Sequence, residues 1–331
     1  MPWLDISASS SPDRARCMSS ALVTVVIPIF NQVKFVVETV DSALRQTHRN
    51  LQVVVVDDGS TDGGAELLAT EFGNRIVLLH QKNGGPSSAI NKGLAAADGA
   101  FIALLGGDDV CVEDRIDIQL ELLQATSNDI VFSKPFLIDA EGGPLADESF
   151  PVFFDERPVQ PLLRTLLLEG NFLCAPTAFM RREAVRKTGS FRPGLIQLQD
   201  YDYWLRAAAS GLKLAEAGPR VVRYRRHSAN LSSTRANFAS TAESIPIFRS
   251  LLDTGAPAEL RRAFPSLFEP VANPDTPLTS FDKALFLLSH PREEIRMMGV
   301  EHLVTLAEDP AFLAKAERFG LNLTRFALNA V

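Results

Sequence analysis

The clearest indication of the fold is the segment Leu51-Gln-Val-Val-Val-Val56, which is followed directly by Asp57-Asp-Gly-Ser-Thr-Asp62. Its first half is a short, continuously apolar run rich in valine, which is typical of a strand buried on both faces of a sheet. Its second half consists of turn residues and carboxylates. Three other runs have the same apolar character as the first half, at residues 22–27, 75–79 and 100–105. The sequence therefore predicts a sheet of buried strands.

Longer amphipathic segments lie between and after these runs. They have helical length and spacing, and they span residues 33–46, 62–72, 87–97 and 114–124. Because strand and helix alternate, we expect right-handed crossovers and a mostly parallel sheet flanked by helices. Asp62 and Ser87 are the expected helix starts, since both follow turn residues and have side chains suited to capping. The predicted fold class is α/β.

The alternation weakens after about residue 125. A fifth strand is expected at 130–132, and further helices and extended segments follow, at 158–168, 200–210, 212–215 and 220–226. From about residue 234 the pattern predicts mostly helical segments broken by prolines, including Pro246. We expect three parts, a flexible leader, an α/β domain and a C-terminal helical appendage, with the bounds 1–20, 21–235 and 236–331.

Composition and charge narrow the function. The chain has 331 residues, with 33 Lys and Arg against 40 Asp and Glu and a net charge of −7, which disfavours broad neutralisation of nucleic-acid phosphates. A polyphosphate ligand would need a metal ion or a local arginine cluster. The widely spaced Cys17, Cys111 and Cys174 predict free thiols in a reducing cytosol. No apolar run reaches the roughly 18 residues that cross a bilayer, and no secretory signal pattern is present, so we expect a cytoplasmic protein.

Polar residues follow three of the predicted strands. They are Pro28-Ile-Phe-Asn31, the 57–62 stretch and Gly106-Gly-Asp-Asp109. In an open parallel sheet these loops meet at one edge, where ligands bind. Gathered carboxylates repel one another unless a cation or ligand donors are present. Because the chain has neither a GxxxxGK[ST] nor a GxGxxG motif after the first strand, we expect this edge to hold a divalent cation that bridges to a diphosphate.

Positive side chains that could meet such a diphosphate gather late in the α/β domain. Arg220, Arg223, Arg225 and Arg226 provide four guanidinium groups within seven residues, and His227 follows. Charge that develops on a leaving diphosphate is stabilised by cations of this kind.

Several blocks together resemble a family 2 glycosyltransferase with the GT-A fold, over about residues 21–235. They are Val25 to Asn31, Ser42 to Thr47, Val54 to Asp62, Asn83 to Gly93, Gly106 to Asp109 followed by Asp114-Arg115, Gln199-Asp-Tyr-Asp-Tyr-Trp-Leu-Arg206, and Tyr224 to Ser228. The resemblance implies an enzyme that transfers a sugar, with inversion, from a nucleotide-diphosphate sugar, expected to be UDP-linked, to a hydroxyl of a glycan, lipid-linked or protein acceptor. It also implies a Rossmann-like nucleotide-binding half, and Mn²⁺ or Mg²⁺ as cofactor.

The resemblance also implies residue roles. Asp200 would be the catalytic base, with Asp202 as second choice, because a carboxylate within reach of the acceptor hydroxyl can take its proton. The metal ligands would be Asp108, Asp109 and His227. Nucleotide contacts would come from Pro28, Asn31, Asp57, Asp58, Asn91, Asp108 and Arg226, with Asp58 facing the base.

The chain departs from the family pattern at two positions. Gly106 stands where the family's Asp-x-Asp-Asp block begins, and Gln199 stands where an acidic residue often precedes the catalytic aspartate. An alternative is therefore a non-catalytic nucleotide-sugar-binding protein or scaffold. A sugar-1-phosphate nucleotidyltransferase is disfavoured, since Pro28 to Asn31 is unlike a glycine-rich basic loop. Peripheral association with the inner face of a membrane that carries a lipid-linked acceptor is also open.

Overall fold

The computed structural model describes residues 21–157, 160–231, 237–254, 256–306, 309–310 and 312–314. The predicted leader, including Cys17, lies outside the described residues. The chain forms two compact units, each made of segments that are separate in sequence. The first comprises residues up to Asp155, Leu173–Ile196 and Lys213–Asn230, and the second comprises Glu156–Phe172, Gln197–Leu212 and the residues from Leu231 onward. The three parts expected from composition stay a prediction.

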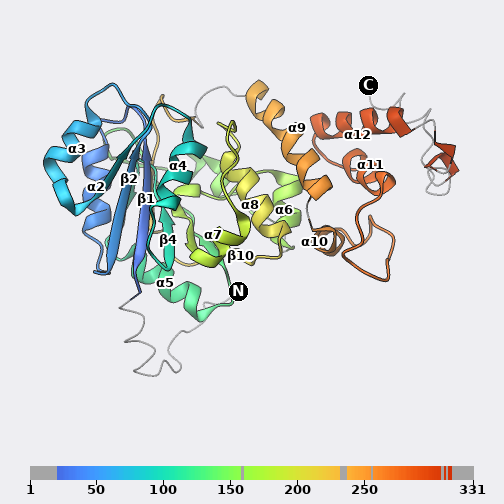
Figure 1. Cartoon of the computed structure of the whole chain (residues 1–331), viewed down its shortest axis with the longest axis horizontal. Helices are drawn as coiled ribbons and strands as arrows, with labels where there is room; N and C mark the ends of the chain where they lie inside the picture. Colours follow the sequence, from blue (N-terminus) through green and yellow to red (C-terminus); the bar gives the residue numbers. More distant parts are fainter. Residues whose placement is uncertain are drawn as a thin grey trace. The chain divides into compact units, whose positions relative to one another are not determined.

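A seven-stranded sheet is the centre of the first unit (Figure 1), with the order β10-β6-β9-β4-β1-β2-β3. Its strands are β1 (Val23–Ile29), β2 (Leu51–Asp57), β3 (Val77–His80), β4 (Phe101–Leu104), β6 (Ile130–Phe132), β9 (Phe179–Arg181) and β10 (Leu214–Glu216). The pairs β4–β1, β1–β2, β2–β3 and β10–β6 are parallel, and only the short β9 runs antiparallel to its neighbours β4 and β6. The prediction of a mostly parallel sheet flanked by helices is confirmed.

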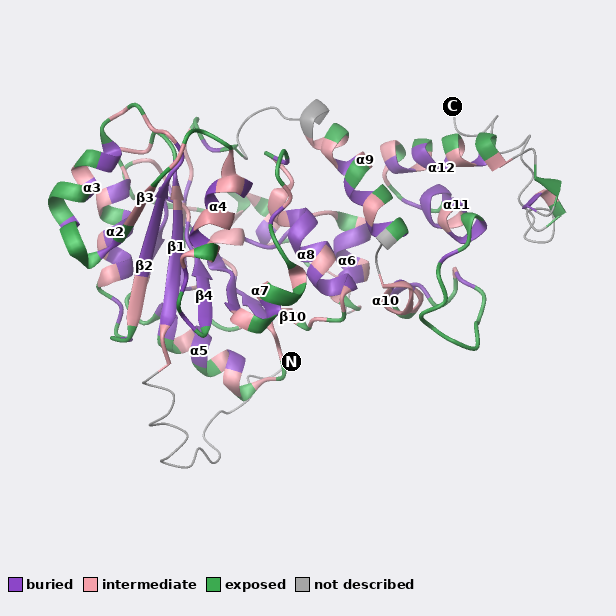
Figure 2. Cartoon of the chain, viewed as in Figure 1, coloured by how far each residue is buried: buried purple, intermediate pink, exposed green. Residues whose placement is uncertain are grey.

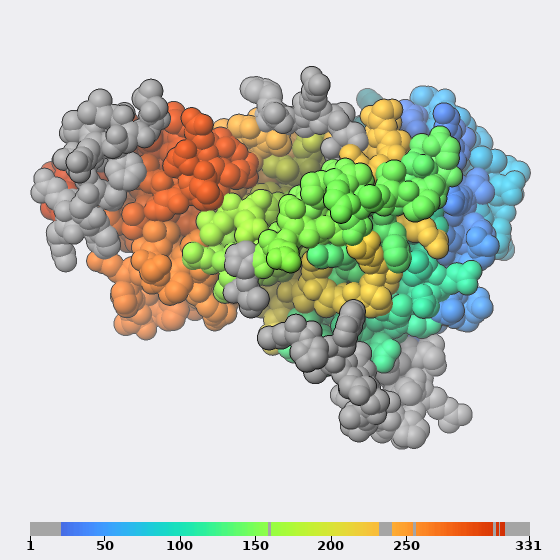
Figure 3. All heavy atoms as spheres, turned by 180° about the vertical axis from the view of Figure 1, so that it is seen from behind, coloured from blue at the N-terminus to red at the C-terminus, as the bar shows by residue number. Residues whose placement is uncertain are grey.

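Helices cover both faces of this sheet. The first unit contains α2 (Val36–Leu44), α3 (Gly64–Phe72), α4 (Pro86–Ala95), α5 (Arg115–Ala125) and α7 (Arg182–Thr188). In Figure 1, α2 and α3 lie on one side of β1 and β2, and α4 lies on the other. Short 3-10 turns complete the unit, at Gly73–Arg75, Asp147–Ser149, Pro151–Phe153 and Ala175–Thr177. Seen from behind, surface atoms from the early part of the chain, in blue, lie side by side (Figure 3).

The valines of β2 explain why the strand runs are apolar throughout. Val53 and Val55 belong to the main core cluster, which also contains residues of α2, α3 and α5. Val54 and Val56 point to the opposite face, where they pack with Ala89 of α4. Successive residues of a strand face opposite sides, so a strand covered on both sides needs apolar residues at every position. Figure 2 shows these central strands as buried.

Two helices begin slightly away from the expected capping residues. Helix α3 starts at Gly64 rather than Asp62, and the Asp62 carboxylate accepts the N–H of Gly64 at 3.0 Å from outside the helix. Helix α4 starts at Pro86, the residue before Ser87. Proline suits the first helical position because its missing N–H needs no partner there. The Ser87 hydroxyl instead donates to the Leu195 carbonyl.

A second sheet has four strands in the order β5-β11-β7-β8. Its first strand in the chain, β5, comes soon after β4. Its strands are β5 (Val110–Cys111), β7 (Phe136–Ile138), β8 (Pro144–Leu145) and β11 (Val222–Arg225). The pair β5–β11 is antiparallel, with Val110 opposite Arg223 and Cys111 opposite Val222. This pairing joins the residues just after β4 to a segment more than 100 positions later in the sequence. Residue pattern alone indicated β11 but not the short β5, β7 and β8.

The second unit is helical in its described residues. Its helices are α6 (Leu162–Glu169), α8 (Gln199–Ala209), α9 (Asn237–Thr254), α10 (Pro257–Ala263), α11 (Ser280–Leu288) and α12 (Glu293–Leu306). The expectation that prolines break these helices is wrong at Pro246, which lies inside α9. In the part of the chain that the structure describes, no helix has the length and apolarity needed to span a bilayer.

Candidate functional site

The loops after β1 and β2 meet at the carboxyl edge of the main sheet, as predicted. Ile29 and Asp57 are paired in register, and the N–H of Asp58 donates to the Ile29 carbonyl at 2.9 Å. Asn31 has a positive φ of 53°, and its side-chain carbonyl accepts the N–H of Thr61. Asparagine tolerates this left-handed conformation better than most residues. The Asn31 side chain therefore ties the two loops together.

Asp58 holds the loop that precedes α4. Its carboxylate is buried and accepts hydrogen bonds from the Gln81 side chain at 2.7 Å and from the backbone N–H groups of Gly84 and Gly85 at 2.9 Å each. A carboxylate has about four acceptor positions. Three are filled by these donors, so about one remains for a further donor.

The neighbouring Asp57 and the more distant Asn91 also bond within the first unit. Asp57 accepts the N–H of Ser60 at 3.0 Å, and its other oxygen lies 3.3 Å from the Nδ1 of His80. The Asn91 amide makes a reciprocal pair with the backbone of Phe191, at 2.8 Å in both directions. These contacts fix the loops of the sheet edge, and the nucleotide-binding roles of Asp57 and Asn91 stay predictions.

Gly93 ends the block that contains Asn91 and fits α4 onto the sheet. A Cβ atom at this position would lie 2.4 Å from a methyl carbon of Val26 on β1. Only glycine allows this approach without a shift of the strand or the helix. This part of the family-like pattern is thus explained by packing.

Asp108 and His227 are brought together by the β5–β11 pairing. The Oδ2 atom of Asp108 lies 2.9 Å from the Nε2 atom of His227 and accepts the Asn230 amide at 3.1 Å. The His227 ring stacks on Phe35, with 4.8 Å between centroids. Both side chains keep about 11% of their surface exposed, which leaves the pair accessible from solvent. Two predicted metal ligands are therefore adjacent although they are 119 positions apart in the chain.

Asp109 is buried beside this pair. Its Oδ1 accepts the N–H of Arg225 at 2.9 Å, and its Oδ2 has no hydrogen-bond partner among the described residues. A Cβ atom at Gly106 would lie 2.5 Å from that Oδ2 and 3.0 Å from Asp108 Oδ1. Burial, and next the charge of Asp108, raise the pKa of Asp109 well above its ordinary value. The missing aspartate at position 106 thus corresponds to space that the Asp109 carboxyl fills.

The four arginines of the basic segment do not act alike. Arg225 is buried and donates to the carbonyls of Asp108 and Ala140, and it pairs with Glu38. Arg220 makes a two-pronged ion pair with Asp147 at 2.9 and 2.6 Å. The expectation that all four face a diphosphate is therefore wrong for these two.

The remaining two arginines are placed differently. Arg223 is exposed on β11, and the Arg226 guanidinium lies over the ring of Phe150, 4.1 Å from its centroid. The nucleotide-binding role of Arg226 stays a prediction.

Among the described residues, no group of three or more His, Cys, Asp or Glu side chains is arranged to hold a metal ion. A magnesium ion is usually held by one or two carboxylates together with substrate phosphates and water rather than by a complete protein cage. Asp108 with His227, and the unpartnered Asp109 oxygen behind them, fit such a substrate-completed site. The chemistry of this donor set suits Mn²⁺ or Mg²⁺.

Asp200 belongs to the second unit and lies in the first turn of α8. One oxygen accepts the N–H of Tyr201 and the other accepts the Asn171 amide, each at 2.8 Å. Burial raises the pKa of Asp200 to about 6, although these two hydrogen bonds act in the opposite direction. The N-cap residue of α8 is Leu198, so Asp200 is not the N-cap. A carboxyl with this pKa is largely ionised at neutral pH and remains basic enough to accept a proton.

Two other residues of the acidic block, Asp202 and Trp204, pack within the second unit. Asp202 is buried and pairs with Arg206 at 2.8 Å, and Trp204 is fully buried, so both support α8. Phe179 on β9 is also fully buried and stacks on Phe101. It therefore forms part of the core of the first unit.

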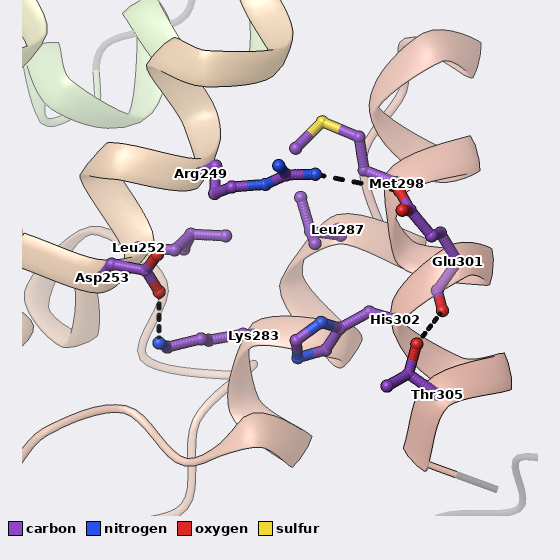
Figure 4. Close-up of a pocket in the computed structure, with 9 residues that line it drawn as sticks. All are labelled: Arg249, Leu252, Asp253, Lys283, Leu287, Met298, Glu301, His302 and Thr305. Atoms are coloured by element: carbon purple, nitrogen blue, oxygen red, sulfur yellow. Dashed lines mark hydrogen bonds and ion pairs between the residues drawn. The ribbon is translucent and has the colours of Figure 1, made fainter.

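A pocket of about 330 Å³ lies between α9, α11 and α12 in the second unit (Figure 4). Its charged lining consists of Arg249, Asp253, Lys283 and Glu301, with His302 among them. Lys283 pairs with Asp253 at 2.6 Å, and Arg249 lies 3.9 Å from Glu301. Because these acids and bases balance, the pocket has no charge excess suited to a diphosphate.

Sequence reasoning missed Asn230, Glu38 and Phe35, which hold the Asp108–His227 pair and Arg225. Asn230 lies three residues after His227 and also accepts the His227 N–H at 2.6 Å. Its place at the end of the last basic block was the available signal. Glu38 on α2 and Phe35, the N-cap residue of α2, carried none, since both look like ordinary residues of a helix and its start.

In comparison with known proteins, residues 24–189 of the chain match the family described as glycosyl transferase family 2. An uncharacterized glycosyltransferase of Rickettsia felis is 34% identical over 192 residues, which cover 56% of this chain and 31% of that protein. The chain thus spans less than a third of the length of this relative.

Two solved structures share the fold. TarS 1-349 of S. aureus in complex with UDP-GlcNAc has a TM-score of 0.55 at 18% identity, covering 88% of this chain and 75% of that one. The mannosyltransferase PcManGT from Pyrobaculum calidifontis, in complex with GDP-Man and Mn²⁺, has a TM-score of 0.56 at 16% identity, covering 94% and 86%. The expected GT-A fold is confirmed by these likenesses, and with half of its length matched by the family model the chain belongs to glycosyltransferase family 2.

Proposed function

We propose that the chain is an inverting, metal-dependent transferase that moves a sugar from a nucleotide-diphosphate sugar, UDP-linked, to a hydroxyl of a glycan, lipid-linked or protein acceptor. The observation that carries the proposal is the Asp108–His227 pair at the carboxyl edge of the main sheet, 2.9 Å apart and accessible. The UDP-GlcNAc and GDP-Man with Mn²⁺ bound by TarS and PcManGT support the donor class.

In this proposal the sheet edge of the first unit binds the donor. Asp108 and His227, with Asp109 beside them, would hold the divalent cation, and the donor diphosphate would supply further oxygen ligands. When bound, the cation lowers the cost of the negative charge on the leaving diphosphate. Asp58 faces the base with its remaining acceptor position, and the loop at Pro28 and Asn31 borders the nucleoside.

Arg226 is the arginine we assign to the diphosphate. Its guanidinium lies over the ring of Phe150, 4.1 Å from the ring centroid. A guanidinium matches two phosphate oxygens at once, and it is always charged. Asp57 and Asn91 support the loops around the nucleotide through their bonds to Ser60 and Phe191.

Asp200 is the proposed general base. The acceptor hydroxyl loses its proton to the Asp200 carboxylate while its oxygen forms a bond to the anomeric carbon, and the bond from that carbon to the diphosphate breaks. This single displacement inverts the anomeric centre. The raised pKa of about 6 supports the assignment, because a base with a pKa near the working pH accepts a proton most effectively.

Donor binding and donor hydrolysis test the proposal. Purified protein is melted in the presence of UDP, GDP, UDP-GlcNAc or GDP-mannose, with and without Mn²⁺, and release of nucleoside diphosphate is then followed. We expect a Mn²⁺-dependent rise in melting temperature with one nucleotide and slow hydrolysis of its sugar. Binding without hydrolysis or transfer to any acceptor would instead favour the non-catalytic binder that Gly106 suggested. The cytoplasmic location, with peripheral contact to the inner face of a membrane, remains part of the proposal to be tested.

A further inference from the structure

The start of helix α8 is held by a residue from the C-terminal region. Glu243 on α9 accepts the N–H of Gln197 at 3.0 Å and the N–H of Leu198 at 2.8 Å, both through the same carboxylate oxygen. Leu198, the N-cap residue of α8, provides no side-chain cap of its own. The bonds from Glu243 therefore fall on the two residues directly before Gln199 and Asp200.

A carboxylate that accepts hydrogen bonds from these backbone N–H groups stabilises the start of the helix. Backbone N–H groups at a helix start have no partner inside the helix, and a carboxylate there is favoured by both hydrogen bonding and the helix dipole. The partner residues are 45 and 46 positions apart in sequence, so the contact is tertiary rather than a local cap. It fixes where α8 begins and the direction in which its first turn leaves.

Glu243 is itself firmly placed. The next residue, Ser244, is buried, and its hydroxyl accepts a hydrogen bond from Arg292 at 2.9 Å. One turn later Phe248 is fully buried and packs edge-on against His290, which in turn lies 2.7 Å from the Leu167 carbonyl of α6. The helix that carries Glu243 is thus anchored to two other elements of the same unit.

We propose that Glu243 is a positioning residue for Asp200, so that the C-terminal helices set the placement of the catalytic base through the start of α8. The proposal rests on the role of Asp200 as base. It gives the C-terminal region, which carries none of the family motifs, a part in the reaction.

Glu243 also acts on Asp200 through its charge. A nearby negative charge disfavours the ionised carboxylate, so it adds to the effect of burial, which raises the pKa of Asp200. The other groups that contact the Asp200 carboxyl are neutral, namely the Asn171 amide and the backbone N–H of Tyr201. Removal of the charge at Glu243 therefore lowers the pKa of Asp200, which a merely structural contact would not do.

The experiment compares Glu243→Ala and Glu243→Gln in the full chain, with Asp253→Ala as the matched control. Asp253 is an exposed carboxylate on the same helix, and it pairs with Lys283 of α11. Hydrogen exchange of the peptide around Gln197 and Leu198 is measured in each variant. The ¹³C shift of the Asp200 carboxyl is titrated in parallel, and the Asp200→Asn protein identifies its signal.

For Glu243→Ala we expect exchange of the two amides to rise about tenfold or more, because both lose their acceptor. Donor hydrolysis with Mn²⁺ should fall about 10- to 100-fold in kcat with little change in the donor KM, as for a displaced catalytic group. Glu243→Gln keeps an acceptor oxygen and should retain most of kcat, while the Asp200 titration and the acidic limb of the rate profile move to lower pH. Asp253→Ala should change none of these.

Unchanged exchange in Glu243→Ala, or an unchanged Asp200 titration in Glu243→Gln, would overturn the proposal. The base assignment fails separately, through normal turnover of Asp200→Asn. A protein with inactive Asp200→Asn but fully active Glu243→Ala keeps the base and loses the positioning role. If Glu243→Ala does not fold, the titration in Glu243→Gln still decides.

Discussion

The Asp200→Asn substitution makes activity and stability move in opposite directions. Burial raises the pKa of Asp200 from 3.8 to about 6, a difference of about two pH units. One unit corresponds to about 1.4 kcal/mol, so the shift is on the order of 3 kcal/mol of folding free energy. Asparagine has nearly the same shape and can still accept hydrogen bonds, but it cannot ionise.

The sign follows from the direction of the shift. Because the folded-state pKa is raised, the protonated Asp200 contributes its full stability below pH 3.8, and this contribution is lost as the pH rises through 6. The free energy of unfolding of the native protein, relative to Asp200→Asn, should therefore fall by on the order of 3 kcal/mol between pH 3.5 and pH 7. Other titrating groups are common to both proteins and cancel in the difference.

Urea unfolding at pH 4, 5, 6 and 7 measures this difference. Trp204 is fully buried on the same helix as Asp200, so its fluorescence reports on the unit concerned. In the same buffers, hydrolysis of the bound donor should decrease about tenfold per pH unit below pH 6, and Asp200→Asn should be slower by about 10²- to 10⁴-fold at pH 7. Parallel stability curves of the two proteins would refute the raised pKa, and normal turnover of the variant would refute its role as base.

Five further substitutions test the sheet edge of the first unit. Asp58→Ala removes the acceptor of three hydrogen bonds and should lower the free energy of unfolding by about 3 kcal/mol in urea titrations. Arg225→Lys loses the fork that reaches several acceptors and should cost about 2 kcal/mol, whereas Arg223→Lys, at an exposed position of the same strand, should be neutral within about 0.5 kcal/mol. Asp108→Ala should abolish the Mn²⁺ dependence of donor binding in calorimetry, and equal heats with and without Mn²⁺ in the native protein would contradict the metal role. Gly106→Ala places a carbon 2.5 Å from a buried carboxyl oxygen and should lower the melting temperature, at a cost of about 1–3 kcal/mol.

The strands and crossover helices of the first unit could be predicted because their signals are local. A run such as Val53 to Val56 is apolar at every position, and the structure buries its two faces against different helices. Helix starts were less accurate, because Asp62 accepts the N–H of Gly64 from outside the helix rather than as its cap. Pro246 was predicted to break a helix but lies inside α9, because packing of this helix outweighs the loss of one backbone hydrogen bond.

The candidate site could be listed from the sequence but not assembled. Nothing local indicates that β5, a strand of two residues, pairs with β11, yet this pairing brings His227 to Asp108. The roles of the arginines also depended on tertiary contacts, because Arg225 and Arg223 lie two positions apart on one strand and face opposite environments. Strand alternation places both on the same face of β11, so it did not indicate that one is buried and the other exposed.

The glycine at position 106 and the orientation of Asp109 explain each other. The Asp109 oxygen without a partner lies where a side chain at position 106 would begin, so a carboxylate could enter there only if Asp109 turned away from the backbone of Arg225. The chain therefore keeps a carboxyl oxygen at this point and reduces the number of acids around Asp108. Fewer neighbouring acids mean less mutual repulsion before the cation binds. The departure from the family pattern is thus compatible with a cation held mainly by Asp108, His227 and the donor itself.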